Sequence, residues 1–89
     1  MTSGTMDDRG TIRDTLLRIA EDAIRRGPGF AQESVVLREA LEELKLSWED
    51  VASQQVMLTC WHDLFREGKL AWGYDVDNPG PPFFHFARR

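Results

Sequence analysis

Apolar residues recur every three or four positions in the first third of the chain, which is the spacing of one face of an α-helix. Thr11 and Asp14 have the spacing of a capping box and predict where this helix begins. Gly27 can adopt the left-handed conformation that ends a helix and Pro28 cannot continue one, so we predict a helix over residues 11–27. Its apolar positions are Ile12, Leu16, Leu17, Ile19, Ala20, Ala23 and Ile24.

A second, shorter amphipathic helix is predicted around residues 37–44. Its apolar positions follow at i, i+3, i+4 and i+7, whereas its polar face is acidic. Val35 and Val36 precede this pattern and either belong to the helix or form a brief strand before it. The apolar positions are Leu37, Ala40, Leu41 and Leu44, and the acidic positions are Glu39, Glu42 and Glu43.

A third helix is predicted over residues 48–67. Ser47 and Asp50 repeat the capping-box spacing, so the helix either runs unbroken or makes one turn and starts again at a cap on Ser53. Gln54 projects onto the apolar side, and therefore either it has a buried partner or the helix begins later. The residues expected to face inward are Met57, Leu58, Trp61, Leu64 and Phe65, with Val51 and Cys60 at the margins of that side.

Two aromatic runs, residues 69–74 and 83–88, come after Gly68 and predict a pair of antiparallel strands. The residues between them are mostly turn formers, so we expect a long, stiff hairpin loop. The predicted fold is α+β, with three helices followed by a C-terminal two-stranded antiparallel hairpin. Residues 1–10 are small, polar and acidic and predict a flexible tail, whereas residues 11–89 predict one domain.

Length and composition indicate the size of the domain and the cellular compartment in which we expect it. A chain of 89 residues has room for one domain with one modest core. The single cysteine, Cys60, excludes an internal disulfide and favours a reducing compartment. We find no export signal and no apolar run near the ~20 residues that span a bilayer. We therefore expect a cytoplasmic protein that does not associate with membranes.

The third helix and the hairpin carry a family resemblance. The pattern Trp61-x-x-Leu64-x-x-x-Gly68-x-Leu70, followed by a hairpin and preceded by two helices, resembles the winged helix-turn-helix superfamily. The resemblance covers residues 11–88. It implies a winged-helix fold and a non-enzymatic protein that binds double-stranded DNA, as a transcriptional regulator and as a dimer.

The same resemblance implies which residues would touch DNA. The third helix would enter the major groove, where a glutamine can pair with adenine and small apolar groups can contact the thymine methyl. The positions facing base edges would be Ala52, Gln55, Val56 and Thr59. The phosphate contacts would come from Arg66, Lys69 and Arg88, together with Arg89, Arg25 and Arg26.

The charge distribution departs from what DNA binding requires. The formal net charge is −4, and DNA affinity depends largely on counterion release by Lys and Arg. The predicted third helix carries four acids and a single cation, Arg66. Asp75 and Asp77 lie at the predicted wing tip, where no Lys or Arg is present. Acids directed at phosphate repel it, which disfavours both insertion of the helix and contact by the wing.

A protein-interaction module is the alternative function. Strand residues alternate between two faces, so a core this small leaves some hairpin aromatics outside it. These aromatics, with the acidic second helix, would form the binding surface for a protein partner or a second copy. The simpler interpretation is that most of them pack the hairpin onto the third helix. The residues concerned are Trp72, Tyr74, Phe83, Phe84 and Phe86.

The sequence offers little for metal or catalytic chemistry. Cys60 and His62 are two positions apart, which places them on different faces of a helix, and no complete ligand set accompanies them. Cys60 projects toward the core, where a nucleophile would be inaccessible to substrate. We therefore predict no metal site, no cofactor and no enzymatic activity.

Overall fold

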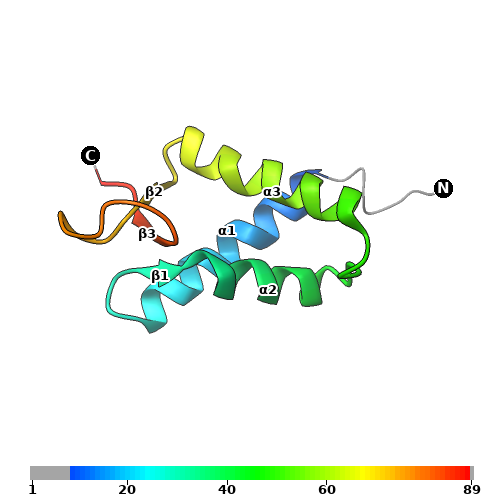
Figure 1. The fold of residues 1–89 in the computed structure, drawn as a ribbon, viewed down its shortest axis with the longest axis horizontal. Coiled ribbons are helices and arrows are strands. Elements are labelled where there is room, and N and C mark those ends of the chain that lie inside the picture. Colours follow the sequence, from blue (N-terminus) through cyan, green and yellow to red (C-terminus); the bar gives the residue numbers. More distant parts are fainter. Residues whose placement is uncertain (1–8, 89) are drawn as a thin grey trace.

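The computed structural model describes residues 9–88 and shows an α+β fold of three helices and a small three-stranded antiparallel sheet (Figure 1). The α+β class and the order of three helices followed by a hairpin agree with the sequence prediction. The elements are α1 (Arg9–Arg26), β1 (Ala31–Gln32), α2 (Glu33–Glu43), α3 (Val51–Arg66), β2 (Leu70–Trp72) and β3 (Phe83–Phe86).

Two predicted helix starts are wrong because the chain begins these helices elsewhere. Helix α1 already includes Arg9, so Thr11 lies inside the helix and not at its cap. The Asp50 carboxylate accepts a hydrogen bond from the Ser53 backbone N–H at 3.1 Å, which makes Val51 the first residue of α3. Neither predicted start of the third helix is correct. Residues 9 and 10 were predicted to belong to the flexible tail but are part of α1. Residues 1–8 lie outside the described residues.

The end of α1 is within one residue of the prediction, whereas α2 starts four residues before the predicted position. Helix α1 ends at Arg26, and the Gly27 N–H donates to the Ala23 carbonyl at 3.1 Å. The left-handed residue is Gly29, with φ 100°, and not Gly27 as predicted. Helix α2 starts at Glu33, so Val35 and Val36 are helical and the strand alternative for them is wrong.

The sheet contains the predicted hairpin and one strand that the sequence did not predict. The strand order is β1-β3-β2, and all pairing is antiparallel. Phe84 of the central strand lies opposite Ala31 on one side and Trp72 on the other. The Glu33 N–H donates to the Pro82 carbonyl at 2.7 Å. The hairpin loop is therefore held against the start of α2.

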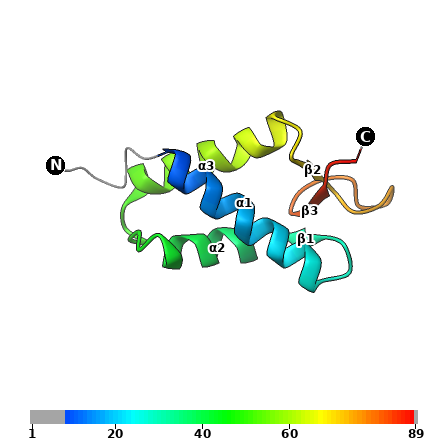
Figure 2. The same ribbon diagram turned by 180° about the vertical axis from the view of Figure 1, so that it is seen from behind.

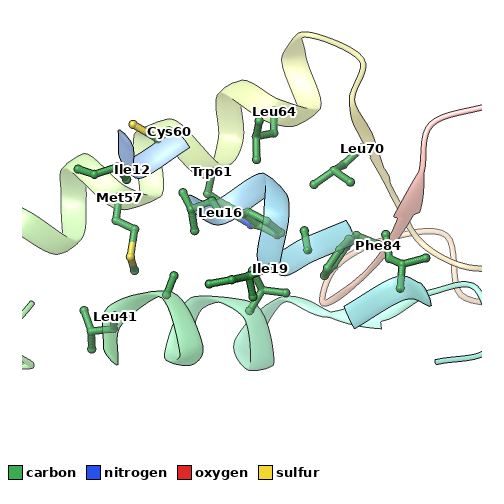
Figure 3. Close-up of a cluster of buried hydrophobic side chains, with 14 residues drawn as sticks. Ile12, Leu16, Ile19, Leu41, Met57, Cys60, Trp61, Leu64, Leu70 and Phe84 are labelled. Carbon is green, nitrogen blue, oxygen red and sulfur yellow. The ribbon is translucent and has the colours of Figure 1, made fainter. Parts of the chain in front are cut away.

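The core lies where α1 crosses α3 and where the sheet closes one end (Figures 2 and 3). Trp61 lies at the centre of this core and is 0% exposed. The Trp61 indole N–H donates to a Glu33 carboxylate oxygen at 2.9 Å, which satisfies the buried donor and joins α3 to the first turn of α2. The other fully buried large apolar side chains are Ile12, Leu16, Ile19, Val36, Leu64, Leu70 and Phe84.

Candidate interaction surfaces

The positions proposed to read DNA bases do not all lie on the open face of α3. Ala52, Gln55 and Thr59 are exposed, and the Thr59 hydroxyl donates to the Gln55 carbonyl at 3.0 Å. Val56 is half-buried and packs against the core cluster. Three of the four predicted reading positions are therefore accessible together.

The predicted phosphate contacts are sparse and partly engaged elsewhere. Arg66 lies 3.3 Å from the Asp63 carboxylate, which competes for its charge. Lys69 and Arg88 are exposed, and the Ala87 N–H donates to the Lys69 carbonyl, so these two cations lie near each other at the open end of the hairpin. Arg89 lies outside the described residues. Helix α3 has no Lys or Arg before Arg66, so its reading face carries no cation beside the exposed polar positions.

The arginines at the end of α1 are also occupied. Arg26 pairs with Asp22 at 2.9 Å, and its guanidinium lies 3.8 Å from Glu39. The Arg25 guanidinium carbon lies 5.5 Å from the centre of the Phe86 ring, a cation–π contact. Both side chains consequently stabilise the fold at the junction of α1 with its neighbours.

The hairpin aromatics mostly pack inward, but only Trp72 and Phe84 pack on α3, whereas the simpler interpretation expected this of most of them. Phe84 is 0% exposed, and Trp72 stacks on Phe65 with ring centres 3.9 Å apart. Tyr74 stacks on Phe30 at 4.2 Å, and Phe83 meets both of these rings edge-on. Among the hairpin aromatics, only Tyr74 remains exposed. The hairpin therefore does not present a broad aromatic surface to a partner.

The loop of the hairpin is braced by its own polar groups. The Asp75 carboxylate accepts from the backbone N–H groups of Asp77 and Asn78 at 3.0 and 2.8 Å. The Asn78 side-chain amide donates to the Tyr74 hydroxyl at 3.0 Å. The Pro81–Pro82 peptide bond is cis. Asp75 thus acts as the acceptor that closes the loop, and it is not an isolated acid at a wing tip.

A groove of about 270 Å³ between α2 and α3 is a concave surface that the sequence did not predict. Figure 1 shows the two helices on either side with α1 crossing behind them, and Figure 2 shows α1 in front from the opposite side. The groove is mainly apolar. Its lining residues are Ser34, Leu37, Arg38, Leu41, Trp48, Gln54, Met57 and Leu58.

Two apolar side chains at this groove are exposed to solvent. Trp48, in the connection between α2 and α3, is 65% exposed, and Leu58 is 36% exposed. The prediction that Leu58 faces inward is wrong, because its side chain lines the solvent-accessible groove between α2 and α3. Val51, predicted at the margin of the inward side, is exposed at the first position of α3. A tryptophan leaves large apolar area in water when it is exposed, which marks such a site as a candidate for binding.

The turn that carries Trp48 is held rigidly. Helix α2 ends at Glu43, and Lys45, two residues later, is in the left-handed region at φ 58°. The Gln54 side-chain amide donates to the carbonyls of Ser47 and Trp48 at 3.0 and 2.7 Å. Gln54 therefore has its partner in this turn, which resolves why a polar residue projects onto the apolar side of α3. The ring of Trp48 extends from a backbone that is already fixed.

The cap of α3 reinforces this turn electrostatically. The Ser53 hydroxyl donates to the Asp50 carboxylate, and this hydrogen bond, with that from the Ser53 N–H, lowers the pKa of Asp50 below its ordinary value. Because the folded-state pKa is depressed, the contribution of the cap is complete above the ordinary pKa of a carboxyl and is lost as pH falls through the depressed one. The start of α3 is therefore fixed at neutral pH.

The charged residues at the groove differ from those on the rest of the helical surface. Arg13 pairs with Glu67 and Arg18 with Glu43, which lowers the pKa of Glu67 and raises that of both arginines. In contrast, Arg38 lines the groove and makes no ion pair with any residue from 9 to 88. Glu49, which follows Trp48, also has no ion pair within that range and is exposed. Within residues 9–88, Arg38 is therefore an unpaired cation on the groove lining, and Glu49 is an unpaired acid next to Trp48.

Cys60 is expected to be nearly inert in the folded protein. It is buried, its thiol lies 3.8 Å from the Arg9 carbonyl, and desolvation raises its pKa above the ordinary value. Because the thiolate is the reactive form, we expect reaction with a disulfide reagent at neutral pH to be far slower than in denaturant. Rapid labelling of the native protein, followed spectroscopically, would contradict this placement.

The remaining chemistry-bearing residues are dispersed. Among residues 9–88, no three His, Cys, Asp or Glu side chains gather closely enough to hold a metal ion. His62 is exposed on α3, and the His85 ring nitrogen Nδ1 lies 2.7 Å from the Gly73 carbonyl in the hairpin. No helix within the described part of the chain combines the length and apolar character needed to cross a membrane.

Comparisons with protein-family models, with curated proteins and with solved structures find no match for this chain.

Proposed function

We propose that this chain is a winged-helix domain that works by binding protein through the groove between α2 and α3. The winged-helix assignment is supported by three helices followed by a β2–β3 hairpin that packs on α3. The same scaffold serves many functions, so the function must be argued from the surface and not from the fold.

The exposed Trp48 beside an apolar groove is the observation that carries the proposal. Tryptophan is enriched among the residues that dominate binding energy at protein interfaces, where it is usually held in a desolvated pocket. Here no pocket formed by residues 9–88 encloses the ring, which is 65% exposed, and the hydrogen bonds from Gln54 hold the turn that presents it. A pre-ordered apolar anchor of this kind loses little conformational entropy on binding.

Duplex DNA is the second candidate ligand. The exposed side chains of Ala52, Gln55 and Thr59 on one face of α3 favour it, and Lys69 and Arg88 lie at the open end of the hairpin. The absence of Lys and Arg from α3 before Arg66 weakens it, because counterion release supplies much of the affinity for DNA. The interaction of Arg66 with Asp63 weakens it further.

Photo-crosslinking in cells tests the two candidates side by side. A benzophenone amino acid in place of Trp48 is expected to form discrete protein adducts, because that side chain would lie within an interface. The matched control is the same substitution at Val76, which is 94% exposed on the hairpin loop away from the groove and is expected to form none. A third probe at Gln55 reports on the proposed DNA face.

Two outcomes would contradict protein binding through the groove. The first is nucleic-acid adducts from the probe at Gln55 together with no protein adduct from the probe at Trp48. The second is a duplex-DNA complex whose affinity falls steeply with salt and is lost when Gln55 and Thr59 are replaced by alanine.

A further inference from the structure

We infer that the occupant of the groove is a second copy of this chain, in a two-fold symmetric pair where each Trp48 enters the groove of the other copy. This inference rests on the proposed function and names its partner. A symmetric interface uses the same patch on both copies, so the patch must contain both a projecting part and a recessed part. Trp48 supplies the projection and the adjoining groove supplies the recess.

The apolar ring of Trp48 suits the apolar lining of the groove. The walls offered to an entering indole ring include Leu37, Leu41 and Leu58, with the Met57 thioether between them. Flexible thioethers and aliphatic groups adapt well to a large aromatic side chain. Since Trp48 itself lines the end of the groove, a two-fold arrangement brings the two indoles next to each other as each enters the opposite groove.

The charged residues near Trp48 and the groove would pair with each other between two copies of the chain. Glu49 follows Trp48 directly, so it would arrive beside the partner groove together with the ring, where Arg38 lies. Two-fold symmetry would form this pair twice. A partner chosen by one sign of charge would need a uniformly charged surface opposite it, whereas Arg38 and Glu49 have opposite signs. The mixture favours a second copy over a uniformly acidic or basic partner.

The area of the proposed interface indicates how tightly the two copies should bind. A large aromatic side chain buries roughly 150–250 Å² when fully enclosed, so two exchanged tryptophans with their groove walls fall below the ~1,200–2,000 Å² of tight complexes. We therefore expect a weak dimer that dissociates on dilution. Sedimentation velocity between about 5 µM and about 500 µM should show the mass rise from one chain toward two.

A charge exchange between two variants gives the decisive experiment. Arg38→Glu places two acids at each contact of its homodimer, and Glu49→Arg places two cations there. Each variant alone is expected to associate about tenfold more weakly or worse than the wild type. Mixed in equal amounts, the two variants restore opposite charges at both contacts of the heterodimer. The mixture is therefore expected to regain the mass of two chains.

The controls separate the interface from the fold. Trp48→Ala should abolish dimerisation while circular dichroism and the unfolding transition stay close to wild type, because the ring is mostly exposed. Val76→Ala removes another exposed apolar side chain and should leave dimerisation unchanged. A chain that remains monomeric to about 500 µM overturns the inference, as does a charge-exchanged mixture that stays monomeric. Crosslinks from position 48 only to a different protein would also overturn it, while supporting protein binding through the groove.

Discussion

Replacing Phe84 with alanine is expected to lower the free energy of unfolding by about 3–5 kcal/mol. Phe84 is fully buried in the central strand, and its ring meets those of Trp61 and Phe65 edge-on at 5.1 and 6.2 Å. Truncation leaves a cavity where α3 meets the sheet. A small domain has about 5–15 kcal/mol of stability in total, so this one change removes a large share. Denaturant unfolding followed by tryptophan fluorescence measures it.

Phe86→Ala is the matched control for this substitution. Phe86 lies in the same strand, is only half-buried, and packs beneath Arg25. We expect Phe86→Ala to lower the free energy of unfolding by less than half as much as Phe84→Ala, because folding removes less of the apolar area of Phe86 from water. Equal losses for the two variants would mean that Phe84 does not join the sheet to α3 as described.

Gly73→Ala is expected to destabilise the domain by about 2–4 kcal/mol. Gly73 has φ 91°, which an alanine adopts only with strain. A Cβ atom there would also lie 2.6 Å from the backbone of Pro79, which approaches closely because the hairpin loop folds back on itself. Thermal unfolding of the variant tests both effects together.

Two other glycines separate strain from collision. Gly29 has φ 100°, and a Cβ atom added there would meet no other atom within 4 Å, so Gly29→Ala should show the strain alone, about 1–2 kcal/mol. Gly80 has neither a positive φ nor a close neighbour, and Gly80→Ala should be nearly neutral. If all three variants lost the same stability, the close approach of Pro79 to Gly73 would not matter.

The helices were predictable because their apolar period reports a buried face directly. Helix boundaries were less so, since they depend on which local hydrogen bond forms. The Asp50 carboxylate bonds to the Ser53 N–H, and the sequence alone also allowed Ser47 and Ser53 as caps. Strand β1 could not be predicted, because Ala31 and Gln32 are extended only through pairing with Phe84 and Phe83, far along the chain.

The candidate surface was predicted less well than the fold. The aromatic residues of the hairpin were correctly recognised as numerous, but their burial depends on Phe30, Phe65 and Arg25, which reach them from other elements. The groove depends on how far α2 and α3 diverge, a property that no local pattern encodes. Leu58 shows the difficulty, because its helical phase is apolar and yet no element covers it fully.

The position of β3 in the sheet affects when this domain can fold during synthesis. β3 is the central strand, yet it follows every other described element along the chain. While a ribosome is still making β3, β1 has no strand to pair with, and the ring of Trp61 has no Phe84 ring to pack against. The sheet and the closed core must therefore form only after residue 86 has left the exit tunnel, in one late step that includes both ends of the described chain.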